Sequence, residues 1–475
     1  MNFDLNRTLS WTNALAATEP GDAADLAMLS DLQGNILKGH GRDHTIHIFI
    51  SFKSAGISAV RALLRELGHE MPSALDQLTS AQVFKSTGAD AGLFMAVFLS
   101  AHGYMLLGAE EHMPPGEAFR GGLKSRRAIL ADPAVAEWDP GYAGDVDAMI
   151  LLANDNTAAL QSASEALQAR IAALEGAAAI VNVETGIAQR NKEDGEGIEH
   201  FGYVDGRSQP LMLEEDIEKE RKSGGIDQWN PTIPLSQVLV PCPGAKLDVS
   251  FGSFFVFRKL EQNVRGFKVR ELDLARAIEN ESGANPGELA GAYVVGRFEN
   301  GTPTALHDLK QPLNRTPVPN NFNFDNDQAG LRCPFAAHIR KTNPRDQTIN
   351  STARLMARRG ITYGERSDDP NDGQVENKPE NGVGLLFMAY QRSLEDQFEF
   401  TQQSWANSPR FHFRASPQPV GIDPVIGQPL RGGSQRYPLN YGTGPLSEEF
   451  DFSGFVTLKG GEYFFAPSLS FFKLL

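Results

Sequence analysis

Apolar and polar residues alternate most regularly over residues 45–52, where every second side chain from Ile46 to Phe52 is isoleucine or phenylalanine. This period of two predicts a strand with one buried face. His47 falls on the other face, where we expect no chemical role. Apolar residues then recur at helical spacing over residues 57–67, and Gly68 is expected to end that helix.

Continuous apolar runs over residues 93–99 and 148–153 are short enough for central strands. A helix is predicted over residues 157–174, strand character resumes at 179–183, and a hairpin is predicted over 81–99. This order of strands and helices predicts a βαββαβ, ferredoxin-like unit. An alternating parallel sheet is the competing fold, but no strand is followed by a Gly-x-Gly-x-x-Gly turn.

The second half of the chain shows a similar mixture of elements, so the two halves could repeat one α+β unit. Residues 1–26 are expected to form a loosely structured arm, and residues 213–234 a charged linker. The further predicted elements are a strand over 251–257, a helix over 269–278, a long ordered loop over 303–327, a strand over 382–390, and a hairpin over 455–465 that turns at Gly460 and Gly461.

Composition narrows the class of protein without identifying a chemistry. The chain has 475 residues, enough for two to four domains, and its 41% hydrophobic content can fill a large core. Forty-four Lys and Arg residues against 59 Asp and Glu residues give a net charge of −15, which argues against nucleic-acid or anionic-membrane partners. The first 17 residues lack the apolar core of a secretory signal, and no run reaches transmembrane length, so a cytoplasmic location is expected.

One histidine carries the first chemical signal. In residues 332–345, a short apolar entry leads to His338, which is followed by Arg340, Lys341 and Arg345. Imidazole binds transition metals well, and the two alanines before it leave room for a flat, bulky ligand. Haem fits, with His338 as axial ligand and one of the cations near its propionates; without a Cys-x-x-Cys-His sequence, thioether bonds are not expected. The alternative is a structural histidine beside an apolar patch.

Two further segments carry charged side chains. Asp205 lies between Gly202 and Gly206, so a tight loop is expected to direct its carboxylate into a cavity, although Asp-Gly also occurs in ordinary surface turns. Arg358 and Arg359 enter a predicted strand, where adjacent side chains point to opposite faces. At most one of them can enter a pocket, and surface ion pairs are the alternative.

Taken together, these segments resemble the dye-decolorizing peroxidase family. Residues 202–206 match its GxxDG signature, residues 333–340 its proximal segment, and residues 358–364 its distal arginine segment. Residues 384–387 and 460–465 also look like family sequence, and the order and spacing agree over residues 30–472. The resemblance implies an α+β fold of two ferredoxin-like halves, with antiparallel sheets, peripheral helices and haem in the C-terminal half. The halves would be residues 1–225, carrying the distal Asp loop, and 226–475, binding one non-covalent haem b.

The resemblance also implies roles for individual residues. His338 would be the proximal ligand to the iron, Asp205 the distal acid/base and Arg358, the first arginine of the pair, the distal cation. A carboxylate is expected on the second nitrogen of the proximal histidine, with Asp423 as first candidate and Asp451 as second. The other residues expected to contact the cofactor are Arg340, Ser208, Leu385 and Phe387.

The implied reaction begins when hydrogen peroxide gives a proton to Asp205, which returns it to the outer oxygen while Arg358 stabilises the developing charge. Bulky aromatic donors such as anthraquinone dyes and phenols would supply the electrons, with Trp405, Tyr437 and Tyr441 as candidate surface relays. Two alternatives are open: a haem-binding or haem-handling protein without turnover, and a bare metal held by His200, His338 and carboxylates. A homo-oligomer is compatible with the sequence.

Overall fold

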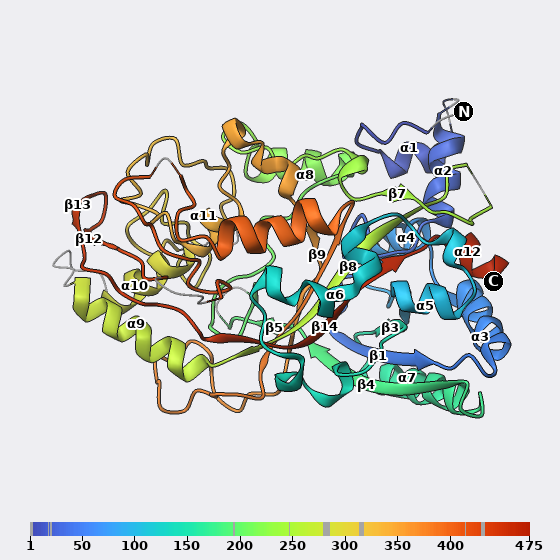
Figure 1. Ribbon diagram of the computed structural model, residues 1–475. Helices are drawn as coiled ribbons and strands as arrows, with labels where there is room; N and C mark the ends of the chain where they lie inside the picture. The colour runs from blue at the N-terminus through green and yellow to red at the C-terminus, as the bar shows by residue number, and fades with distance from the viewer. Residues whose placement is uncertain are drawn as a thin grey trace.

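A computed structural model describes the chain at residues 3–17, 19, 21–192, 195–246, 248–278, 286–312, 318–413, 415–428 and 433–475. Its centre is one large antiparallel sheet, around which helices and long loops are arranged (Figure 1). The strands of this sheet are β1 (His44–Phe52), β2 (Phe94–Leu99), β3 (Ala148–Ala153), β4 (Ala178–Ile187), β7 (Val240–Pro241), β8 (Phe251–Gln262), β9 (Ala357–Arg358), β10 (Ile361–Tyr363), β11 (Gly384–Gln391) and β14 (Val456–Ala466). The predicted α+β class with antiparallel sheets is confirmed, and the parallel alternative is wrong.

The strand order divides the sheet into two similar sets. The order is β10-β11-β8-β14-β2-β3-β1-β4, with β7 paired to β8 and β9 to β11. The first strand set is β1 to β4 and the second strand set is β8, β10, β11 and β14; in each, the order is fourth, first, third, second. The sets join where Phe465 of β14 pairs with Leu99 of β2.

The two edges of the sheet also approach each other, because the Thr362 hydroxyl of β10 donates to the Ile187 carbonyl of β4. The inward faces of the two sets therefore meet in an aromatic core. The ring centroids of Phe49 and Phe257 are 4.8 Å apart, and those of Phe98 and Phe255 are 4.3 Å apart. Because successive side chains on a strand alternate, the even-numbered residues of β8 from Arg258 to Gln262 point away from this core.

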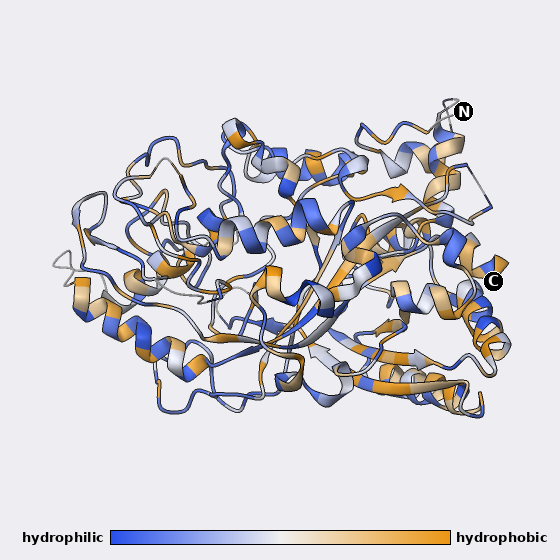
Figure 2. Cartoon of the chain, in the orientation of Figure 1, coloured by the Kyte–Doolittle hydropathy of each residue, from blue (hydrophilic) through white to orange (hydrophobic). Residues whose placement is uncertain are grey.

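Helices cover the outside of the sheet. The first strand set is covered by α7, while α12 packs on α3, and Figure 2 shows strongly hydrophobic strands beneath more mixed helices. No helix in the described part of the chain is long and apolar enough to cross a lipid bilayer. The helices are α1 (Trp11–Ala16), α2 (Asp22–Asp31), α3 (Ile57–Glu70), α4 (Ala74–Thr87), α5 (Ala101–Leu106), α6 (Glu117–Leu130), α7 (Thr157–Ala172), α8 (Glu214–Ser223), α9 (Val264–Ile278), α10 (Pro286–Val295), α11 (His338–Thr342) and α12 (Leu469–Leu474), with the helical segments η7 (Leu394–Glu399) and η8 (Thr401–Ala406).

Several predicted local elements were wrong. The expected arm contains α1 and the first half of α2; residues 1–2, 18 and 20 lie outside the described residues. The expected linker begins with α8, and the predicted hairpin over 81–99 contains the end of α4. The loop predicted over residues 303–327 is irregular wherever it is described; residues 313–317 are not.

Three glycines are predicted from the sequence to end a helix or to form a turn. In the structure they are required by close packing instead. Gly68 lies inside α3, where a Cβ atom would lie 2.6 Å from Phe472 of α12. Gly460 and Gly461 lie within the continuous strand β14, and a Cβ at Gly460 would lie 2.1 Å from the ring of Tyr142. A glycine therefore marks a close approach here as readily as a turn.

Candidate active site

A cavity of about 270 Å³ lies on the outward face of the second strand set. The sheet contributes apolar wall from Leu260, Leu385 and Phe387, and α11 contributes His338. The segment that follows β6 (Gly197–Ile198) lines the cavity with Glu199, Phe201 and every residue from Tyr203 to Gln209. Six residues predicted from the sequence line this one cavity: Ser208, Asp205, His338, Arg358, Leu385 and Phe387.

His338 is the first residue of α11 and is held by a buried carboxylate. Its Nδ1 lies 2.9 Å from Oδ2 of Asp423, which is fully buried, and Oδ1 of Asp423 accepts the backbone N–H groups of Val425 and Ile426. Burial lowers the pKa of His338, but the charge and hydrogen bond of Asp423 outweigh it and raise that pKa overall. Nε2 has no hydrogen-bond partner among the described residues, so its lone pair is available to a metal. The second candidate, Asp451, is exposed and bonds Ser453 instead.

Asp205 lies at the tip of a loop with left-handed glycines on either side, at φ +97° for Gly202 and +77° for Gly206. Its backbone N–H donates to the Gly197 carbonyl at 3.0 Å, while its carboxylate is exposed and forms no ion pair with any described residue. The charges of both Asp205 and Arg358 act on His338 and move its pKa in opposite directions. These three side chains therefore face one space.

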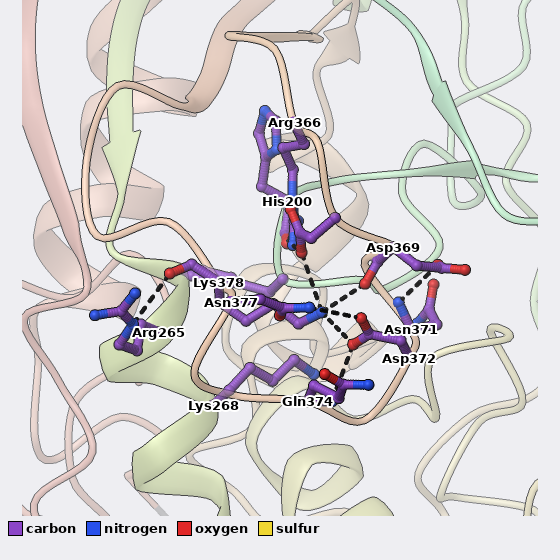
Figure 3. Close-up of polar contacts among 12 residues, drawn as sticks. His200, Arg265, Lys268, Arg366, Asp369, Asn371, Asp372, Gln374, Asn377 and Lys378 are labelled. Atoms are coloured by element: carbon purple, nitrogen blue, oxygen red, sulfur yellow. Dashed lines mark hydrogen bonds and ion pairs between the residues drawn. The ribbon is translucent and has the colours of Figure 1, made fainter.

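A neighbouring loop, residues 364–382, packs beside His200 (Figure 3) and braces the backbone between His200 and Asp205. Arg366 donates to the His200 carbonyl at 2.5 Å, and Asn371 donates to the Gly202 carbonyl at 3.2 Å. The loop is itself fixed by Lys378, whose ammonium is 2% exposed and donates to two aspartates and a carbonyl. His200 bonds the Tyr363 carbonyl, and burial lowers its pKa to about 4.

The two adjacent arginines separate as the strand period predicts. Arg358 lines the cavity, and its guanidinium makes no hydrogen bond to any described residue. Arg359 instead donates to the carbonyls of Asn35, Ile36 and Arg358 at 2.8–2.9 Å. Arg359 is therefore a structural side chain, whereas Arg358 is free to bind a ligand.

The cations after His338 are placed differently from one another. Arg340 does not line the cavity, because its guanidinium pairs with Asp327 at 2.8 Å between the rings of Phe324 and Phe335. Lys341 is likewise buried and donates to the carbonyls of Ser408 and Phe411. The structure thus leaves only Arg345 of these three cations at the cavity.

Arg345 belongs to a cationic group whose other two members, Arg207 and Arg297, were not predicted from the sequence. It donates to Ser208 at 2.9 Å and to Asn320 at 2.6 Å, and Arg207 and Arg297 line the same end of the cavity. Arg207 pairs with Glu220, but neither Arg297 nor Arg345 has a carboxylate partner among the described residues. Burial, with the charge of Arg207, lowers the pKa of Arg297 to about 9. Arg207 adjoins the Asp205 motif and could have been found there, whereas no motif marks Arg297.

The donor set fits an iron porphyrin. An oriented imidazole offers Nε2 to a metal, apolar side chains suit the macrocycle, and unpaired arginines suit its carboxylates. A bare-metal site fits less well, because no group of three or more His, Cys, Asp or Glu side chains in the described residues could hold a metal ion. His200, which a bare-metal site would need as a ligand, does not line the cavity.

Comparisons with known proteins agree with this geometry. Residues 308–411 match the family model described as Dyp-type peroxidase, C-terminal. The multifunctional dye peroxidase DyP2 of Amycolatopsis sp. is 45% identical over 485 residues and 100% of both chains, and its structure gives a TM-score of 0.92. A DyP-type peroxidase structure from Anabaena sp. gives 0.89 at 37% identity, covering 99% of both chains.

A structure of a dye-decolorizing peroxidase in complex with 2,6-dimethoxyphenol is also similar, with a TM-score of 0.78 at 27% identity over 94% of this chain and 98% of that one. Full-length identity of 45% with a dye peroxidase is far above what a shared fold alone requires. The chain belongs to the dye-decolorizing peroxidase family, whose members are haem-dependent.

Proposed function

We propose that this chain is a haem peroxidase that reduces hydrogen peroxide and oxidises bulky aromatic donors such as anthraquinone dyes and phenols. The observation that carries the proposal is the placement of His338, with its free Nε2, in one cavity with Asp205 and Arg358. One non-covalent haem b per chain would be held by His338, with Arg345 and Arg297 near its carboxylates. Leu385 and Phe387 would contact the macrocycle from the sheet.

The fold supports a division into two ferredoxin-like halves, residues 1–225 and 226–475, since both strand sets have the order of that motif. The second half would bind the haem, because His338, Arg358 and the sheet wall all belong to it. The first half would contribute the Asp205 loop. The complete site would then exist only when the two halves are packed together.

The side chains suggest how peroxide is handled. A bound haem iron would supply the electrons that cleave the oxygen–oxygen bond. The ionised carboxylate of Asp205 accepts one proton of hydrogen peroxide and returns it to the outer oxygen, which then leaves as water. The guanidinium of Arg358, which has no partner among the described residues, stabilises the negative charge that develops on that oxygen. Asp423 keeps the Nδ1 proton of His338 in place, so Nε2 remains a ligand.

The electron donors are aromatic molecules in this proposal, as the 2,6-dimethoxyphenol complex of a relative suggests. Donors too large for the cavity would be oxidised at the surface through an aromatic side chain. Of the three candidates, Trp405 and Tyr437 are buried, and only Tyr441 is partly exposed, donating to the Thr304 carbonyl at 2.7 Å. Tyr441 is therefore the first relay to replace.

The proposal is tested by loading the apoprotein with haemin and recording absorption spectra before and after one equivalent of peroxide. We expect a Soret band that changes within the mixing time in the wild type. In Asp205→Asn the band should form equally well, but the reaction should be about 10²–10⁴-fold slower, the usual contribution of positioned acid/base catalysis. Equal rates in both proteins would remove Asp205 from the reaction, and a Soret band that peroxide leaves unchanged in the wild type would instead support a haem-handling protein without turnover.

A further inference from the structure

Glu199 lines the same cavity, six positions before Asp205, and the peroxide chemistry above does not use it. Its carboxylate is the centre of the loop that carries Asp205. Oε2 accepts the backbone N–H of Phe201 at 2.8 Å, and Oε1 accepts that of Tyr203 at 3.0 Å. The backbone of Glu199 bonds the loop too, because its N–H donates to the Tyr203 carbonyl and its carbonyl accepts from Gly202.

The sheet holds this carboxylate from the other side. Gln262, the last residue of β8, donates through Nε2 to Oε2 of Glu199 at 2.5 Å. Oε1 of Gln262 is buried and has no partner among the described residues, so the bond to Glu199 is the contact that fixes this side chain. Glu199 thus connects the glycine-containing Asp205 loop to the strand that forms the cavity wall.

We propose that Glu199 is a positioning residue of the peroxide reaction, which fixes the backbone of residues 199–205 against β8 and thereby holds the carboxylate of Asp205 at the peroxide. This inference rests on the proposed function. Three N–H groups converge on two carboxylate oxygens, and an amide in the same place would offer only one oxygen. Glu199→Gln must therefore lose at least one of these bonds while keeping its size.

The ionisation of Glu199 predicts a pH dependence of the peroxide reaction, which is a second test of its positioning role. Burial without a cationic partner, together with the charge of Asp205, outweighs the three N–H donors and raises the pKa of Glu199 to about 7. The other charged groups near it lie beyond Tyr203, where Lys268 pairs with Glu271 and Glu299. An ionised Glu199 accepts N–H bonds more strongly, and its charge favours proton movement from peroxide to Asp205. We expect the peroxide reaction to accelerate as pH rises through about 7.

A double-mutant cycle on the haem-loaded protein tests the proposal. Glu199→Gln should slow the reaction with peroxide about ten- to a hundredfold, as a small misplacement of a catalytic group does. In the Asp205→Asn background the same change should cost less than about twofold, because coupled residues are not additive. The step near pH 7 should be absent from Glu199→Gln. Additive losses, or an unchanged pH profile, would overturn the positioning role.

The matched control is Glu462→Gln. Glu462 is also a buried carboxyl group whose pKa is raised by burial, and it accepts the backbone N–H groups of Leu123 and Tyr463 at 2.8 and 2.9 Å, but it does not line the cavity. Its replacement should leave the peroxide rate unchanged. If Asp205→Asn itself had no effect, the proposed function would fail first, so the two failures are distinguishable.

Hydrogen exchange of the apoprotein gives a readout that is independent of turnover. Backbone amides of residues 200–206 should exchange faster in Glu199→Gln than in the wild type or in Glu462→Gln. If Glu199→Gln does not fold, Gln262→Leu removes only the contact with β8 and should show the same coupling to Asp205 with a smaller loss. Unchanged exchange in residues 200–206 would contradict the proposal.

Discussion

The two strand sets share one order of strands but use their outward faces differently. In the first set, β2 and β3 contain no polar residue, every residue in them is buried, and α7 packs over the set. In the second set, β8 places Arg258, Leu260 and Gln262 on its outward face, where they line the cavity. The comparison teaches that the strand order supplies a scaffold in both sets, and that the residues on one outward face decide where chemistry occurs.

Replacing His338, at the cavity, and His47, in the first strand set, tests this difference most directly. His338→Ala should abolish stable haem retention, because it removes the candidate axial ligand; haemin titration of the apoprotein, followed by the Soret band, measures this. His47 on β1 is buried with both ring nitrogens unpartnered among the described residues. His47→Leu should leave haem affinity unchanged and stabilise the fold, since it removes an unsatisfied polar group. Normal haem binding by His338→Ala would contradict the assigned ligand.

The adjacent arginines sharpen the comparison within the second set. Arg358→Leu should slow the reaction with peroxide about 10²-fold, the usual cost of one charge-stabilising donor, with little change in stability. Arg359→Leu should leave that rate unchanged but lower the free energy of unfolding by about 1–3 kcal/mol, because buried carbonyls lose their donors. Stopped-flow absorption and urea unfolding of both variants distinguish the roles; exchanged phenotypes would reverse the assignment.

Leucine truncations compare how tightly side chains are packed on the outward faces of the two strand sets. Leu152→Ala in β3 removes a fully buried side chain from the outward face of the first set and should cost about 2–5 kcal/mol of unfolding free energy. Leu385→Ala in β11, at the cavity wall, should cost the apoprotein roughly half as much, because one side of Leu385 already lacks packing partners. Equal losses in urea denaturation would mean that the cavity wall is packed as tightly as the first set.

The smallest expected effect is the net dependence of wild-type stability on pH, because two buried groups, one in the first strand set and one at the cavity, act in opposite directions. Burial lowers the pKa of His47 to about 4, so stability should be lost as pH falls from about 6.5 to 4, where the unfolded chain binds the proton first. The raised pKa of Glu199 acts in the opposite direction: stability should be lost as pH rises from about 4.5 to 7. Each change taken alone is on the order of 3 kcal/mol, and the two nearly cancel where their pH ranges overlap. Urea unfolding of the apoprotein from pH 4 to 8 should therefore show little pH dependence in the wild type, stability that falls as pH rises in His47→Leu, and stability that rises with pH in Glu199→Gln.

Elements with a strong period, and residues within dense motifs, could be predicted from the sequence. Alternation identified β1, and the continuous apolar runs identified β2 and β3. The helix α4 was missed because its apolar residues do not follow one face, and Val83 and Phe84 are exposed. Local patterns report burial, and they fail where an element is fixed mainly by its capping residues.

The residues of the candidate active site could likewise be predicted where they belong to a distinctive local sequence, but not where distant contacts decide their role. Asp205, His338 and Arg358 each stand in a short, distinctive run, and the structure brings all three to one cavity. Arg340 and Arg345 could not be separated from sequence, because tertiary contact with Asp327 decides which of them is already neutralised. Glu199 was missed since its importance depends on Gln262, which is distant along the chain.

The position of β14 has a consequence for how the protein is made. This strand pairs with β8 along most of its length and with β2 at Phe465, and both partner strands come far earlier in the chain. During synthesis the ribosome must therefore release β14 before the second strand set can be completed and joined to the first. Such high contact order favours slow, late assembly, so the cofactor would meet a finished binding site only after β14 has been synthesised.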